Sequence, residues 1–190
     1  MKALTHEEAR AWCEKRHVRV TRSQYLYFDT PQRLCMAFEL PEKPYQLVAL
    51  ANALLPYSES LPFLGALLWI RQWGVWSELV ERCGLRVMEV MRMIHGDGRP
   101  LQEAPGYLFD SQELIDLEVS FVQPMLVGWD AFLVPECGEY IVATSHDEVT
   151  CVLSRTPETH ERMLSELQPW NPREGGEWYF KGIGAPAEDS

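Results

Sequence analysis

The chain has 190 residues, 46% of them hydrophobic, and a formal net charge of −11 from 28 acidic and 17 basic side chains. This size and hydrophobic content predict a soluble, folded domain and exclude a disordered chain. A surface of this charge repels phosphate backbones and anionic lipid headgroups, so we expect neither nucleic acid nor a membrane as a partner. The best local basic patch, Arg16, His17, Arg19 and Arg22, is short and is interpreted as the solvated edge of a strand.

The cysteines and the N-terminal residues indicate a reducing compartment. Five cysteines occur with no C-x-x-C spacing and no clustering with histidine, so we expect reduced thiols and predict neither a metal site nor a cofactor. The first 22 residues carry charges throughout and contain no apolar leader. No stretch approaches the roughly 18 consecutive apolar residues of a membrane span, and the predicted location is the cytoplasm.

In chain order, the first predicted elements are a helix and two strands. Thr5 and Glu8 have the T-x-x-E form of a capping box and predict a helix that runs to about Arg16. Strands are predicted at 18–28 and 34–40, the second with alternating large apolar residues. The Asp-Thr-Pro turn between them predicts that the two strands form a hairpin.

The middle of the chain contains the predicted centre of the fold. A helix rich in Leu and Ala is predicted over 45–55, and a loop with two Ser and two Pro over 57–62. The unbroken apolar run 64–70 indicates a central strand that is covered on both faces. Apolar residues at three- and four-residue spacing predict a helix over 76–94, in which Gly84 marks a close packing point or a bend.

The second half of the chain predicts a helix, a three-stranded meander and a last helix. Asp110 and Glu113 predict a helix through about Gln123, which Pro124 kinks or ends. The run from 128 to 155 predicts three antiparallel strands, at 131–134, 140–144 and 149–154. Thr156 and Pro157 then predict the N-cap and the first residue of a helix that runs to about Gln168.

These elements predict a single α+β domain over residues 1–170, with a predominantly antiparallel sheet of about six strands packed with four to five helices. Strict alternation of strands and helices is absent, which argues against a doubly wound parallel sheet. Residues 171–190 are rich in Gly and Pro and are predicted to form a C-terminal extension whose last residues are mobile.

The last turn of the meander gathers His146, Asp147 and Glu148, the densest group of potentially catalytic side chains in the sequence. Ser and Asp are favoured turn residues because their side chains form local hydrogen bonds. A polar turn therefore explains the group without any chemistry, and this is the interpretation that we favour over a catalytic site.

Two further catalytic arrangements involve cysteine or a second histidine. Cys137 lies about 30 Å from His146 along one predicted strand, and Cys151 about 10 Å or more away across the hairpin, so neither suits a Cys–His pair. Pairs that use Cys13, Cys35 or Cys83 stay open. His95 and Asp97 follow the strongest helix and are the second candidate site, although a histidine at a helix C-terminus also has a structural explanation.

A cluster of tryptophans lies where the central strand passes to the following helix. Its members are Trp69, Arg71, Trp73 and Trp76, and Trp129 joins them if the fold brings it close. Our preferred interpretation is a buried edge of the core, since Trp is usually well buried. The alternative is a partly exposed aromatic patch with an arginine, a composition that is favoured at protein interfaces.

Two classes of function follow. The first, which we favour, is a non-enzymatic acidic protein-interaction or regulatory module that binds a protein partner or a second copy of itself. The second is a small enzyme or small-molecule-binding domain with a site near His146 and Asp147 or near His95 and Asp97, whose polar groups converge only in three dimensions.

Overall fold

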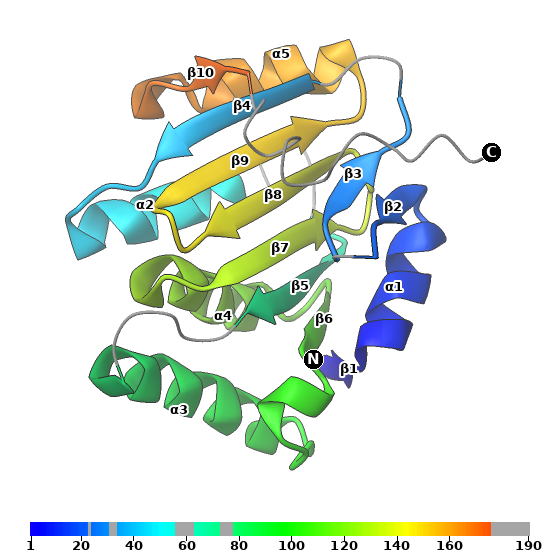
Figure 1. Ribbon diagram of the computed structural model, residues 1–190, viewed down its shortest axis with the longest axis vertical. Coiled ribbons are helices and arrows are strands. Elements are labelled where there is room, and N and C mark those ends of the chain that lie inside the picture. The colour runs from blue at the N-terminus through cyan, green and yellow to red at the C-terminus, as the bar shows by residue number, and fades with distance from the viewer. Residues whose placement is uncertain (23, 31–33, 56–62, 73–77, 176–190) are drawn as a thin grey trace.

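A computed structural model describes residues 1–22, 24–30, 34–55, 63–72 and 78–175, and it is α+β as the sequence predicts. Its main feature is an eight-stranded antiparallel sheet with the order β1-β6-β5-β7-β8-β9-β4-β10 (Figure 1). The strands of this sheet are β1 Lys2–Leu4, β4 Leu34–Glu39, β5 Gly65–Gln72, β6 Gly106–Asp110, β7 Asp130–Pro135, β8 Tyr140–Ser145, β9 Val149–Ser154 and β10 Arg173–Glu174. A separate two-stranded sheet pairs β2 Val18–Val20 with β3 Leu26–Phe28.

Helices cover both faces of the large sheet. They are α1 His6–Glu14, α2 Pro44–Leu54, α3 Glu78–Ile94, α4 Leu114–Val127 and α5 Pro157–Glu166, and short 3-10 turns span Leu101–Glu103 and Gln168–Trp170. One face packs against α2, α3, α4 and α5, and the other against α1 and the β2–β3 hairpin. Within the first layer, α4 lies between α2 and α3.

Strand β5 is an interior strand of the sheet and is covered on both faces, as its unbroken apolar run predicts. It pairs with β6 on one side and with β7 on the other. Leu68 and Ile70 pack toward α4, whereas Leu67 and Trp69 pack toward α1 and the β2–β3 hairpin. Because a strand alternates its side chains between two faces, only apolar residues at every position suit a strand that is covered on both.

Several local predictions are confirmed. Thr5 and Glu8 form a reciprocal capping box at α1, and Thr156 caps α5 by accepting a hydrogen bond from the backbone N–H of Thr159. The meander forms from β7, β8 and β9 with antiparallel pairing.

Among the described residues, no helix is both long and apolar enough to span a membrane.

The predicted hairpin of 18–28 with 34–40 is wrong. The chain reverses within 18–28, where β2 and β3 pair with each other, and β4 instead lies between β9 and β10. Gln24 adopts a left-handed backbone with a φ of 61°, a conformation that tight turns require. The meander offers β4 a long apolar neighbour in β9, with six paired positions from Leu34 to Glu39.

The sheet is also larger than the six strands predicted. Strands β1 and β10 lie at the two edges of the sheet, and β6 lies beside β1. All three are short and adjoin turn residues, so the sequence pattern predicts loops there. Strand β10 lies within the predicted extension 171–190 and pairs with β4. The predictions for the loop 57–62 and for the mobile last residues lie outside the described residues.

Helix α4 differs from its prediction at both ends. Its N-cap is Glu113, whose side chain accepts a hydrogen bond from the backbone N–H of Asp110 instead of closing a capping box. Pro124 lies inside the helix, which continues to Val127 and ends at Gly128 with a φ of 67°. A left-handed glycine satisfies the terminal carbonyls, and here the N–H of Trp129 donates to the carbonyl of Pro124.

Gly84 of α3 is a close packing point, which was one of its two predicted roles. A Cβ atom at this position would lie 3.0 Å from the ring of Trp129 and 3.1 Å from a methyl of Val127. Trp129 is fully buried, so its ring has little freedom to move aside. The absence of a side chain therefore lets α3 approach the C-terminal end of α4.

We predict that Gly84→Leu lowers the free energy of unfolding by about 1–3 kcal/mol, because the added atoms overlap a rigid indole ring. Urea unfolding followed by circular dichroism measures the change. Gly98→Leu is the matched control, since no atom lies within 4 Å of a Cβ there. Equal stability of the two variants would contradict the close packing of α3 on Trp129.

Candidate functional site

A chain of three polar side chains crosses one end of the sheet. Arg71 at the end of β5 forms an ion pair with Asp130 at the start of β7. The other oxygen of the Asp130 carboxylate, Oδ1, accepts hydrogen bonds from the backbone N–H of His146 at 2.9 Å and contacts its ring Nδ1 at 2.7 Å. The guanidinium of Arg71 also lies over the ring of Tyr25, 4.4 Å from its centroid.

Asp130 is the buried member of this chain, with a side chain only 7% exposed. Burial by itself raises the pKa of its carboxyl group, but hydrogen bonds from His146 and Arg71 outweigh burial and hold the pKa below its usual value. The carboxylate therefore stays charged and fixes one edge of the His146 ring. Ring atom Nε2 of His146 lies 3.6 Å from Oδ1 of Asp147.

His146 lines a cleft of about 720 Å³ between α2, α4 and the β8–β9 turn. Three exposed carboxylates border it, on Glu42, Asp147 and Glu148. The remaining lining is Leu40, Pro41, Leu47, Met125, Leu126, Val127, Gly128 and Ser145. A cleft of this size is within the range of ligand pockets, which combine apolar walls with a few polar groups.

The turn from Ser145 to Glu148 is a polar turn in its local bonding. The N–H of Glu148 donates to the carbonyl of Ser145 at 3.2 Å, and the N–H of Asp147 donates to Oγ of Ser145 at 3.2 Å. The carbonyl of Glu148 accepts from the N–H of Leu40 at 2.8 Å, which ties the turn to the end of β4. A catalytic role for the turn stays a hypothesis. Asp130, the residue that orients His146, was not predicted from the sequence.

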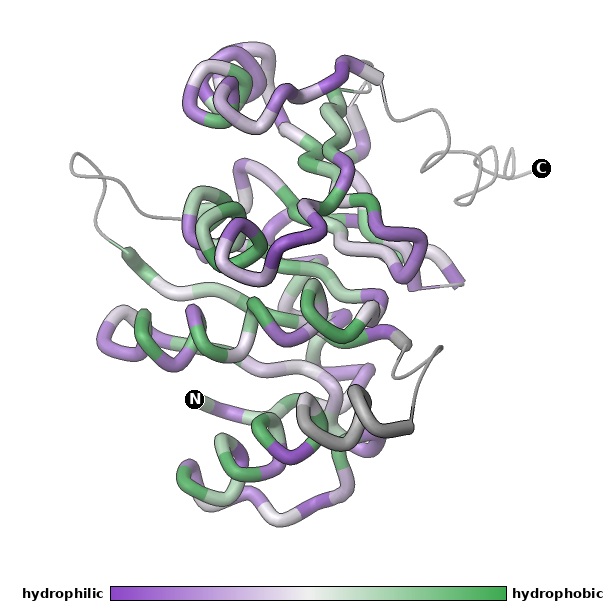
Figure 2. The backbone as a smooth tube through the Cα atoms, turned by 90° about the vertical axis from the view of Figure 1, so that its left-hand side faces the viewer, coloured by the Kyte–Doolittle hydropathy of each residue, from purple (hydrophilic) through white to green (hydrophobic). Residues whose placement is uncertain are grey.

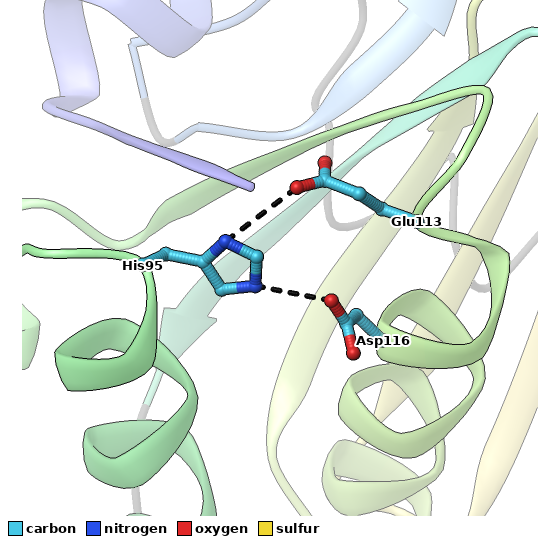
Figure 3. Close-up of side chains that lie close together, drawn as sticks. All are labelled: His95, Glu113 and Asp116. Atoms are coloured by element: carbon cyan, nitrogen blue, oxygen red, sulfur yellow. Dashed lines mark hydrogen bonds and ion pairs between the residues drawn. The ribbon is translucent and has the colours of Figure 1, made fainter.

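The second candidate, His95, lies in a different cluster from the one predicted. Ring atom Nε2 contacts Oδ2 of Asp116 at 3.0 Å, and Nδ1 lies 3.5 Å from Oε1 of Glu113 (Figure 3). The amino group of Met1 contacts the same Nδ1 at 3.0 Å and forms an ion pair with Glu113. These contacts join the first residue, the end of α3 and the start of α4.

His95, Glu113 and Asp116 are residue types that bind divalent metals, and one ligand atom of each lies within 4.8 Å of the others. The imidazole ring, however, stands between the two carboxylates and offers each of them a different nitrogen (Figure 3). A metal that used all three side chains would require the ring or a carboxylate to turn. As it stands, the cluster is an ion-pair network.

Asp97 does not join His95 in a shared network. Hydrogen bonds from the side chain and backbone of Arg99, and a further bond from Arg92, hold the pKa of its carboxyl group well below the usual value. Arg92 is buried, and its guanidinium also donates to the carbonyl of Pro100 at 3.0 Å. Asp97 thus neutralises the charge of the buried Arg92 and stabilises the loop after α3.

Two of the described cysteines, Cys13 and Cys151, are not activated nucleophiles. Burial raises the pKa of the Cys13 thiol to about 12, and contact with Cys35, together with burial, raises the pKa of Cys151 far above its usual value. Thiols of raised pKa are poor nucleophiles. Cys151 pairs with Ala143 across the hairpin, as predicted, and the side chain of Cys83 lies outside the described residues.

The tryptophan cluster is a core feature where it is described. Trp69 is 1% exposed and Trp129 is 0% exposed, so neither side chain can form part of an exposed aromatic patch. Trp69 packs toward α1, and its indole N–H donates to Nδ1 of His6 at 3.3 Å. Arg71 belongs to the Asp130 chain, and Trp73 and Trp76 lie outside the described residues.

A surface that the sequence did not predict lies on the helices. The outward sides of α2, α4 and α3 carry exposed large apolar residues, which we call the helical face: Tyr45, Val48, Ile115, Val119, Leu126, Val90, Met93 and Ile94. Hydrophobic residues recur along all three helices (Figure 2). The composition of α2 and α4 could have indicated this surface. An amphipathic helix has one polar side, whereas these two helices carry apolar residues on their outward sides as well.

Comparisons with known proteins identify no relative. No family model, no curated protein and no solved structure matches this chain.

We predict that Asp130→Asn lowers the free energy of unfolding at neutral pH by about 2–4 kcal/mol, because Arg71 and His146 lose their buried anion. The native pKa of Asp130 lies below its unfolded value of about 4. Its contribution is therefore present above about pH 4 and disappears as the pH falls through the native pKa. Denaturant unfolding at several pH values should show the gap between native protein and variant narrowing in acid.

Asp147→Asn is the matched control, since this carboxylate is 71% exposed. Its effect on stability should stay within about 0.5 kcal/mol. A gap for Asp130→Asn that does not change with pH would contradict the charged, hydrogen-bonded state of Asp130.

Proposed function

We propose that this protein is a non-enzymatic acidic protein-interaction module that binds a partner through the helical face. The partner is a protein that presents an apolar surface bordered by lysine and arginine side chains. The observation that carries the proposal is the distribution of apolar residues on α4.

Helix α4 is apolar on both sides. Leu117, Phe121 and Met125 point into the core, and its exposed residues are Ile115, Val119 and Leu126, which are 73%, 42% and 37% exposed. Their spacing of four and seven places them on one side of the helix. Asp116, Glu118 and Gln123 flank this outward stripe and are only partly exposed. An apolar stripe along a helix is normally covered by another element, so the outward side of α4 supports a protein contact.

The neighbouring helices extend this surface. The exposed residues of α2 include Tyr45, Val48, Ala49 and Asn52 and no charged side chain. With α4 of 14 residues, a rise of about 1.5 Å per residue and three helices spaced about 9 Å apart, the footprint of the helical face, polar positions included, is roughly 500 Å². A typical interface covers about 800 Å² per partner, so this footprint is large enough to form most of one.

Charge at the borders favours a basic partner over a second copy. Beyond α2, helix α5 exposes Glu158, Glu161 and Glu166, and the chain as a whole carries −11. Two copies would bring like charges together, whereas lysines and arginines around an apolar centre would be attracted. The expected interaction is therefore between different proteins.

The alternative function, a small-molecule-binding domain or enzyme with a site at His146, is supported by one observation. Asp130 fixes the ring of His146 at the wall of a cleft, which is how a general acid or base is oriented in many sites. Turnover of a substrate that His146→Gln abolishes without loss of stability would favour this alternative.

We predict that Val119→Glu weakens binding of the partner at least tenfold, since it places a charge in a desolvated apolar contact. A photo-crosslinking residue at position 119, used in the native host, identifies the partner by mass spectrometry. Binding of that purified partner to the native protein and to the variant is then measured by isothermal titration calorimetry.

Ala11→Glu is the matched control. It adds the same charge at an exposed helical position, but α1 packs on the opposite face of the sheet. Equal affinity of both variants for the partner would refute the helical face as the contact surface. Sedimentation of the protein alone adds a second check, because a dimer that Val119→Glu dissolves would assign this face to self-association and overturn the proposal.

A further inference from the structure

The cleft beside His146 concentrates negative charge from several elements. Glu42 follows β4, and Asp147 and Glu148 lie on the β8–β9 turn, so three carboxylates border one opening. The last turn of α4, Met125 to Gly128, forms another wall. A helix C-terminus carries the negative end of the helix dipole, equivalent to about half an elementary charge. Carboxylates and dipole therefore act in the same direction.

Positive groups near the cleft do not cancel this charge. Arg71 forms an ion pair with the buried carboxylate of Asp130. The ring of His146 faces two carboxylates, Asp130 at 2.7 Å and Asp147 at 3.6 Å. Lys43 does not line the cleft. The N-terminus of α2, at Pro44, carries the positive end of a helix dipole, which offsets the negative end of α4. The three border carboxylates therefore make the field inside the cleft negative.

The other walls of the cleft are apolar. Leu40 and Leu47 line the side toward β4 and α2, and Met125 and Leu126 line the side toward α4. An arginine or lysine side chain matches this arrangement, because a long apolar stem ends in a cation. Neighbouring apolar residues of the same segment would contact the same walls.

We infer that this cleft binds an arginine or lysine side chain, flanked by apolar residues, from a polypeptide segment of the protein partner. The inference rests on the proposed function for the source of the side chain. It is continuous with the helical face, since Leu126 belongs to both surfaces. The cleft thus recognises a basic anchor beside the apolar contact.

The test titrates isotope-labelled native protein with the blocked peptide acetyl-Ser-Leu-Arg-Leu-Ser-amide and follows backbone amide shifts by NMR. Shifts are expected at Val127, Gly128 and the turn 146–148. The same peptide with citrulline in place of arginine keeps the shape and removes the charge, and it should bind at least tenfold more weakly. Binding should also weaken as salt rises, because the border carboxylates are exposed.

Variants of the cleft separate charge from fold. The double substitution Asp147→Asn and Glu148→Gln should weaken the arginine peptide about five- to tenfold, as expected for two partly screened ion pairs. Glu14→Gln is the matched control, since it removes an exposed carboxylate from α1, which packs on the opposite face of the sheet. It should leave the affinity unchanged. Val119→Glu should also leave peptide binding intact, so failure of the helical face and failure of the cleft are distinguishable.

Three outcomes would overturn the inference. The first is equal binding of the arginine and citrulline peptides. The second is a shift pattern away from the cleft, or an equal loss of affinity in Glu14→Gln. The third is tighter binding of butylguanidinium, a free guanidinium compound with a single charge like the peptide, than of the peptide, which would identify a small molecule rather than a polypeptide as the source of the cation.

Discussion

The structure depends on the need to cover both faces of its central strands. Strands β5 and β7 carry large apolar residues at successive positions, so neither face can be left in water. The layer of α2, α3, α4 and α5 covers one face, and α1 with the β2–β3 hairpin covers the other. The cleft beside His146 lies at an end of the strands, and the helical face lies on the outer sides of the helices.

Asp130 illustrates how a polar group is held at the border of such a core. Its carboxylate joins β5 through Arg71 and the β8–β9 turn through His146. The same contacts that keep it charged also fix the position of the turn, and so determine where Asp147 and Glu148 stand at the cleft. A stabilising interaction and the shape of a binding surface are thus produced by one buried anion.

The helical face and the cleft form a combined surface with two kinds of contact. The apolar centre on α4 and α2 supplies burial without directional preference. The carboxylates on the cleft border and on α5 supply charge selection, which discriminates between partners more than it adds affinity. An acidic chain with an exposed apolar centre is suited to a basic partner, and the net charge of −11 acts at longer range in the same sense.

The sequence by itself determined the local elements. Capping residues such as Thr5 and Thr156, the spacing of apolar residues in α3, and the apolar run of β5 depend only on near neighbours. The α+β class and the meander followed from these patterns. The burial of Trp69 and Trp129 agreed with the preferred interpretation of that cluster.

Only the tertiary structure decided the pairing of β4 with β9 and the convergence of Arg71, Asp130 and His146. It also decided that His95 meets Asp116 and Glu113 instead of Asp97. Each of these contacts joins elements that are distant along the chain, and side-chain periodicity contains no information about which distant element will lie alongside. The exposure of the outward side of α4 could not be predicted either, because the sequence does not show whether an apolar residue faces the core or a partner.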